Sequence, residues 1–207
     1  MIKGTKICGV SDEKTLKFIL NHKHPSQFVG FITNYEKSHR NVNLDYLKKL
    51  SDLNNNHTSL VSVLVNPDNE ILEKIKNFKF DYYQLYDVEP ERTNLIKKKY
   101  NKKIISALTI EKFEDVENYK LYQDISDIIL FDGKGYEKSI GFNHKFLDKV
   151  PNYITKMIAG NIKIDNIPKL KNLDFFIDLS SALENDEGKK DLNKIDYFLN
   201  NIKFYEA

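Results

Sequence analysis

Cysteine is almost absent from this 207-residue sequence, which contains a single one, Cys8. One thiol cannot form an internal disulfide or a cysteine-based metal cluster, so a disulfide-stapled secreted scaffold and a zinc finger are excluded. Long hydrophobic runs are also missing, because runs such as Ile128–Phe131 fall far short of the roughly 18 to 20 residues that cross a bilayer. The N-terminus lacks the apolar segment of a signal peptide, so we expect a cytoplasmic protein with no membrane partner.

A marked excess of one charge is missing as well. The 32 basic and 30 acidic residues leave a net charge of +2, with lysines scattered among Asp and Glu. This pattern argues against a nucleic-acid partner, and the charge-rich composition favours a monomer. Only Arg40 and Arg92 are arginine. Because only guanidinium offers a planar two-pronged hydrogen-bond donor, an arginine in this lysine-rich background is a candidate for ligand binding.

What the sequence does contain is a regular alternation of two kinds of segment, in a composition (41% hydrophobic, 30% charged) typical of one globular domain over residues 1–207. Short apolar runs typical of buried strands alternate with amphipathic segments typical of helices. The strands are expected at Thr5–Cys8, Phe28–Ile32, Leu60–Val65, Asp81–Leu85, Ile104–Leu108, Asp127–Phe131, Thr155–Ala159 and Phe175–Leu179.

Helix punctuation supports the segments in between. Ser11 is expected to open the first helix as its cap, followed by the stripe Leu16, Ile19 and Leu20, and Leu44, Leu47 and Leu50 form the stripe of the second. Pro67 and Pro90 are expected at the first positions of the third and fourth helices. The later helices are expected near Glu111–Leu121, Phe146–Val150, Ile164–Leu170 and Lys190–Ile202. Eight strand–helix units fill the sequence and predict a (β/α)₈ TIM barrel, whereas an open doubly wound sheet of about five or six strands leaves units unexplained.

In such a barrel the active site lies at the carboxyl ends of the strands, which directs attention to three polar residues. Cys8 precedes a helix N-terminus, whose dipole favours a thiolate base or nucleophile; an inert buried cysteine is the alternative. Asp132 ends the sixth strand, where partial desolvation raises a carboxyl pKa and suits a general acid; a helix or turn cap is the alternative. Arg40, in the second loop, can clamp a carboxylate unless it is simply a solvated charge.

The seventh and eighth loops are where this fold often binds phosphate. Their sequences are Ala159-Gly160-Asn161-Ile162 and Asp178-Leu179-Ser180-Ser181-Ala182. Such small residues let backbone N–H groups and serine hydroxyls approach a phosphate. The five histidines show no metal-binding or catalytic spacing, so no metal is expected.

Taken in order, these segments resemble the phosphoribosylanthranilate isomerase family of tryptophan biosynthesis. The resemblance extends over essentially the full length and is carried by Lys6-Ile7-Cys8-Gly9, Phe31 through Arg40, Val63-Leu64-Val65-Asn66, Gln84-Leu85, Asp132, Ala159-Gly160, Asp178-Leu179-Ser180-Ser181, Glu184 and Gly188-Lys189-Lys190-Asp191. Three loops depart from the family pattern. Tyr86-Asp87 stands for His-Gly, and Ala159 and Ala182 each replace a glycine, so these loops either keep negative φ or hold phosphate differently.

The resemblance implies a cofactor-free aldose–ketose isomerase acting on a phosphorylated small molecule. It implies Asp132 as general acid, Cys8 as general base, Arg40 on the anthranilate carboxylate, Asp178 and Gln84 as orienting groups, and Gly160, Asn161, Ser180 and Ser181 on the phosphate. Two alternatives remain, since a fold does not fix a substrate. One is another phosphosugar isomerase on the same barrel, and the other is a degenerate barrel that binds a phosphorylated metabolite or a protein without turnover.

Overall fold

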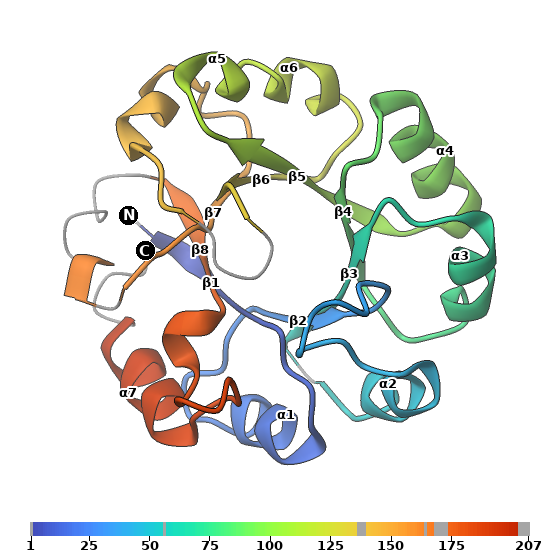
Figure 1. Cartoon of the computed structure of the whole chain (residues 1–207), viewed down its shortest axis with the longest axis vertical. Coiled ribbons are helices and arrows are strands. Elements are labelled where there is room, and N and C mark those ends of the chain that lie inside the picture. The colour runs from blue at the N-terminus through green and yellow to red at the C-terminus, as the bar shows by residue number, and fades with distance from the viewer. Residues whose placement is uncertain (1, 56, 136–139, 164, 168–173, 203–207) are drawn as a thin grey trace.

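The strands form a closed barrel, in which each is parallel to its two neighbours (Figure 1). This computed structural model describes residues 2–55, 57–135, 140–163, 165–167 and 174–202. The strands are β1 (Ile2–Cys8), β2 (Phe28–Ile32), β3 (Ser59–Val65), β4 (Tyr82–Tyr86), β5 (Lys103–Ile110), β6 (Ile128–Gly133), β7 (Lys156–Ile158) and β8 (Phe175–Leu179). The predicted (β/α)₈ architecture is therefore confirmed.

Helices surround the barrel as an outer ring (Figure 1). They are α1 (Glu13–Leu20), α2 (Leu44–Ser51), α3 (Asn69–Ile75), α4 (Pro90–Tyr100), α5 (Phe113–Val116), α6 (Tyr119–Tyr122) and α7 (Leu192–Ile202), with the 3₁₀ helices η1 (His144–Lys149) and η3 (Ser181–Leu183). Two helix starts were predicted wrongly. Asp12 rather than Ser11 caps α1, and Asp68 caps α3, so Pro67 lies outside that helix. Pro90 does begin α4, as predicted.

The later helices depart further from the expected pattern. The single helix predicted near Glu111–Leu121 is two short helices, α5 and α6, and the one predicted around Phe146–Val150 is the 3₁₀ helix η1. The helix expected near Ile164–Leu170 lies mostly outside the described residues. The last helix begins at Leu192 rather than Lys190, because Lys190 forms a bridge with Glu184 in the preceding loop.

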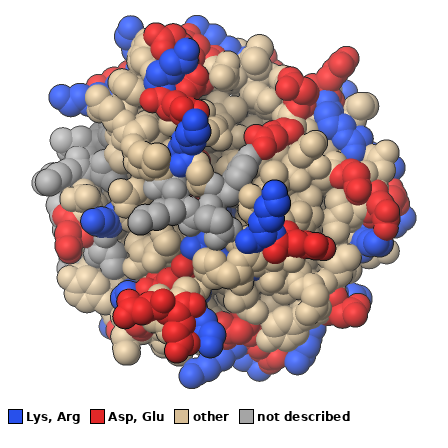
Figure 2. Space-filling model, in the orientation of Figure 1, with Lys and Arg blue, Asp and Glu red and all other residues tan. Residues whose placement is uncertain are grey.

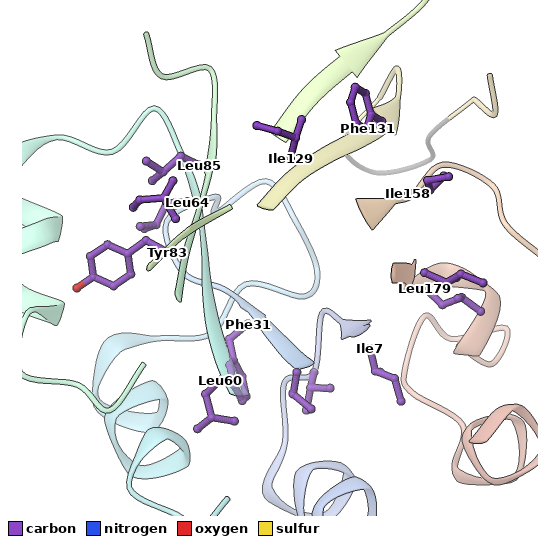
Figure 3. Close-up of a cluster of buried hydrophobic side chains, with 14 of the residues drawn as sticks. Ile7, Phe31, Leu60, Leu64, Tyr83, Leu85, Ile129, Phe131, Ile158 and Leu179 are labelled. Carbon is purple, nitrogen blue, oxygen red and sulfur yellow. The ribbon is translucent and has the colours of Figure 1, made fainter. Parts of the chain in front are cut away.

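The core has two layers because alternate side chains of a barrel strand point inward and outward. The outer layer packs between strands and helices, and Figure 3 shows Leu64, Tyr83 and Leu85 of β3 and β4 within it. The inner layer fills the barrel with side chains such as Phe28, Val61 and Ile105. These apolar side chains fill the interior of the barrel, so the pocket and its polar residues lie at the carboxyl ends of the strands.

Strand β7 is the shortest of the eight, with three residues. It pairs with β6 over residues 156–158 and with β8 only through Met157 and Ile158. By contrast, β5 and β6 pair over six positions, from Ile105 to Ile110. The barrel is therefore joined most weakly beside the seventh loop.

The surface carries both signs of charge side by side, as Figure 2 shows for one face. In the described part of the chain, no helix combines the length and apolar character that a bilayer span requires.

Candidate active site

A pocket opens at the carboxyl ends of the strands, with an empty volume of about 720 Å³ that includes its open mouth. It brings together residues from six strands and from the loops that follow β2, β6, β7 and β8. Among the residues that line it are Cys8, Arg40, Tyr86, Asp132, Asp178, Ser180 and Ser181. Residues that are far apart in the sequence therefore meet where sequence reasoning placed the site.

Cys8 ends β1 and is 8% exposed, with its side chain in the pocket. Burial raises the pKa of its thiol, while the charge of Lys6 lowers it. The net result is a raised pKa, so the lowered pKa that the sequence led us to expect is not found; α1 begins only at Glu13. The neighbouring Gly9 has φ +73°, and a Cβ there would lie 2.4 Å from Cδ of Arg40. Glycine at this position therefore lets the arginine pass directly over the end of β1.

Asp132 lies on β6 and lines the same pocket as Cys8. The Tyr86 hydroxyl donates to Asp132 Oδ2 at 2.8 Å, whereas Oδ1 is buried with no partner among the described residues. Burial is the largest influence and raises the pKa of Asp132 to about 7, although the Tyr86 hydrogen bond lowers it. A carboxyl with this pKa is partly protonated at neutral pH, as a general acid must be. The raised pKa expected from the sequence is present.

Lys6 is a charged residue at the site that sequence reasoning named only as part of a motif. It is fully buried inside the barrel, and its Nζ lies 2.6 Å from Asp178 Oδ2. The signal that could have found it is the period of two along β1, since Lys6 and Cys8 occupy alternate positions and share one face. Asp178, in β8, lines the pocket as expected.

Arg40 is buried, at 6% exposed, and is not the solvated surface charge considered as an alternative. Its Nε and Nη2 donate to the two carboxylate oxygens of Glu184 at 2.7 and 2.9 Å. Lys190 Nζ donates to the same carboxylate at 2.6 Å. Burial raises the pKa of Glu184, but Arg40 and Lys190 together lower it to about 2. Glu184 therefore stays ionised and fixes the plane of the guanidinium.

A second pocket, with an empty volume of about 500 Å³, lies between the seventh and eighth loops. Asn161, Ser180 and Ser181 line it. Gly160 has φ +92°, and a Cβ there would lie 2.7 Å from the backbone nitrogen of Gly133, so this position requires glycine.

The two alanines that replace family glycines fit their loops without strain. Ala159 and Ala182 are not among the described residues with positive φ, whereas Asn161 is, at 51°. Of the two possibilities left open by the sequence, these positions thus keep negative φ. Asparagine tolerates the left-handed region better than most residues, so it suits the position after Gly160.

Gln84 lies deeper than the other predicted site residues. It is fully buried on β4, and neither amide atom has a hydrogen-bond partner among the described residues. It is not among the residues that line the main pocket. The described residues also contain no group of three or more His, Cys, Asp or Glu side chains placed to hold a metal ion.

Comparison with known proteins points to one family. The sequence model of the family described as N-(5′-phosphoribosyl)anthranilate (PRA) isomerase matches residues 5–201. An N-(5′-phosphoribosyl)anthranilate isomerase from Rhizobium rhizogenes is 31% identical over 208 residues, covering 95% of this chain and 92% of that protein.

Solved structures share the fold. A phosphoribosylanthranilate isomerase from Thermotoga maritima superposes with a TM-score of 0.86 at 24% identity, covering 99% of this chain and 100% of the other. Another isomerase of that name, in complex with reduced 1-(o-carboxyphenylamino)-1-deoxyribulose 5-phosphate, gives a TM-score of 0.83 at 23% identity, with the same coverage.

Proposed function

Because the chain belongs to the N-(5′-phosphoribosyl)anthranilate isomerase family, its reaction is the isomerisation of that aminoaldose to the ketose, and we propose that Asp132 and Cys8 carry the proton transfers. The product is 1-(2-carboxyphenylamino)-1-deoxyribulose 5-phosphate. The observation that supports these roles is one pocket lined by both a carboxyl with a pKa of about 7 and a thiol. Two such groups can act as an acid and a base on one substrate.

Asp132 acts first in this proposal. Its carboxyl proton passes to the furanose ring oxygen, the C1–O bond breaks, and the substrate nitrogen supplies the electron pair that forms an iminium. Cys8, as thiolate, then removes the proton from sugar C2, and the C2–H electrons neutralise the iminium to give an enolamine. Tautomerisation of the enolamine gives the ketone. Every step moves protons and electron pairs already present in enzyme and substrate.

Arg40 binds the anthranilate carboxylate in this proposal. The guanidinium carries five N–H donors in a fixed plane, and Glu184 engages two of its nitrogens while Arg40 still lines the pocket. A guanidinium held in one plane loses less freedom on binding, so it orients the ring that the carboxylate belongs to.

The phosphate is proposed to lie between the seventh and eighth loops. Gly160, Asn161, Ser180 and Ser181 surround this region, in which the second pocket lies. Asp178 and Gln84 are proposed to orient the sugar. For Gln84 the supporting observation is that neither atom of its buried amide has a hydrogen-bond partner among the described residues. A buried amide without partners is unfavourable, and a sugar hydroxyl of the substrate would supply one.

We also propose that the protein acts as a monomer in the cytoplasm. The supporting observation is the surface, since Figure 2 shows charges of both signs spread over one face of the molecule. Light scattering of the purified protein tests the oligomeric state. A mass near 24.3 kDa agrees with the proposal, and twice that value contradicts it.

A turnover assay with phosphoribosylanthranilate generated in situ tests the function. We expect ketose formation by the natural chain and none by Cys8→Ala, which should still bind the reduced product analogue because the deletion leaves Arg40 and the phosphate loops in place. Normal turnover by Cys8→Ala would remove the thiol from the mechanism. Absence of turnover by the natural chain, with binding of a phosphorylated ligand retained, would favour a non-catalytic barrel. Turnover of a different phosphosugar would favour another isomerase.

A further inference from the structure

The lysine inside the barrel has no role in the reaction as described so far. Lys6 is fully buried, and an ammonium removed from water is strongly unfavourable unless it is paired. Its pair is Asp178, whose Cα is its register partner across β1 and β8 and whose Oδ2 lies 2.6 Å from Nζ. Attraction to Asp178 and to Cys8 outweighs burial and raises the pKa of Lys6, so the side chain is an ammonium.

The Lys6 ammonium also lies beside the Cys8 thiol. Both side chains rest over Gly30 of β2, where an added Cβ would lie 3.0 Å from Cys8 Sγ and 3.2 Å from Lys6 Nζ. The missing side chain at Gly30 therefore provides the space that both groups occupy. The result is one cation between two acids, Cys8 and Asp178.

The two acids compete for this cation. Burial is the main cause that raises the pKa of the Cys8 thiol; the charge of Lys6 opposes it, and the charge of Asp178 adds to it. Two other titratable groups lie near the thiol. The charge of Lys190 lowers the thiol pKa, whereas Tyr86 on β4, whose own pKa is raised by burial, is a neutral phenol. Asp178 itself is incompletely satisfied, because its Oδ1 is buried without a partner among the described residues.

We propose that Lys6 is a positioning residue whose ammonium promotes ionisation of the Cys8 thiol, and that Asp178, which competes for the same ammonium, opposes this ionisation. This inference rests on the proposed role of Cys8 as the general base. When Cys8 ionises, its S–H bond breaks and the proton passes to a water molecule. Lys6 keeps its three N–H bonds and its positive charge, which stabilises the thiolate, while the negative charge of Asp178 acts against it.

The composition of the chain makes this directly measurable. Cys8 is the only cysteine in the sequence, so the pH dependence of alkylation by iodoacetamide reports its thiolate alone. The experiment uses the full chain without substrate and compares Lys6→Met, Asp178→Asn and the double variant. Lys156→Met is the matched control, since Lys156 is also a buried lysine but its Nζ donates to the carbonyl of Val150, away from the pocket.

We expect the two single variants to move the alkylation profile in opposite directions. Lys6→Met should shift the alkylation profile to higher pH, because loss of a neighbouring opposite charge raises the pKa of an acid by about one unit or more. At a fixed pH below the thiol pKa, the alkylation rate should then fall roughly tenfold or more. Asp178→Asn should shift the profile to lower pH, since the Lys6 ammonium then stabilises the thiolate with no competing carboxylate. The double variant should lie above the natural chain but below Lys6→Met, and Lys156→Met should match the natural chain.

Other outcomes overturn the proposal. A common profile for all variants, or shifts of Lys6→Met and Asp178→Asn in the same direction, would show that Lys6 and Asp178 are only a structural ion pair. If Lys6→Met does not fold, Asp178→Asn and the double variant decide, since the latter leaves no unpaired buried ion. Turnover by the natural chain with unchanged alkylation profiles refutes this inference alone, whereas opposite shifts without any turnover refute only the proposed role of the thiol.

In turnover, Lys6→Met should be less active than the natural chain at neutral pH, and this difference should narrow as the pH rises and the thiol ionises without help. A purely structural defect would lower activity equally at every pH. The pH dependence therefore separates positioning of a proton from support of the fold.

Discussion

Replacing Tyr86 by phenylalanine changes one hydrogen bond at the acid and little else. The phenol hydroxyl of Tyr86 donates to Asp132 Oδ2 at 2.8 Å, and the aromatic ring that fills the barrel mouth remains in the variant. This hydrogen bond stabilises the ionised carboxylate and lowers the pKa of Asp132, which burial holds at about 7. Tyr86→Phe should therefore raise this pKa.

The size of the shift follows from the strength of the bond. A hydrogen bond to a charged group contributes about 1.5 to 3 kcal/mol, which corresponds to roughly one to two pKa units. The pKa of Asp132 should then rise from about 7 towards roughly 8 to 9. Because the general acid acts in its protonated form, the fraction of enzyme with an active acid falls as pH rises through this pKa, and in Tyr86→Phe that fall should begin at higher pH.

The assay is kcat/KM for phosphoribosylanthranilate as a function of pH, which reports ionisations of the free enzyme. Tyr83→Phe is the matched control, because Tyr83 is also buried on β4 but packs outside the barrel, and its hydroxyl has no partner among the described residues. Its profile should overlay that of the natural chain. A Tyr86→Phe profile with an unmoved alkaline limb, or one moved to lower pH, would refute the assignment of that limb to Asp132.

Three further substitutions test the site. Asp132→Asn keeps the shape of the side chain but carries no acidic proton, so kcat should fall roughly a hundredfold or more. Arg40→Lys keeps the charge but loses the planar fork, so KM should rise about ten- to a hundredfold, whereas Arg92→Lys should match the natural chain; equal effects at both would refute a substrate clamp. Gly160→Ala places a Cβ 2.7 Å from the backbone nitrogen of Gly133, on a residue whose φ is +92°. Calorimetry should therefore show a free energy of unfolding lower by about 1 to 3 kcal/mol.

The strands were predictable because those of a parallel barrel are buried and read as apolar runs. Phe28–Ile32 and Phe175–Leu179 were predicted with the observed bounds. Helix starts were less predictable because neighbouring residues can each cap a helix, as Ser11 and Asp12 illustrate. The break between α5 and α6 has no such local marker in the sequence.

Cys8 and Asp132, the proposed base and acid, were predicted because each ends an apolar run at a strand end, a local signal, and both line the pocket. Two other features have no local signal. Lysine is among the residues least often fully buried, so Lys6 was not expected inside the barrel. The pair of Arg40 with Glu184 joins residues 144 positions apart, a contact that spacing along the sequence cannot show.

The short strand β7 determines where the barrel is expected to unfold first. A closed barrel opens first at its weakest joint, and the joint between β7 and β8 consists of the two register pairs formed by Met157 and Ile158. The loops that follow these two strands are the ones proposed to hold the phosphate. A substrate that contacts both loops should therefore hold β7 and β8 together, so that ligand binding stabilises the barrel against partial unfolding. The amide protons of β7 should then exchange with solvent more slowly when the site is occupied.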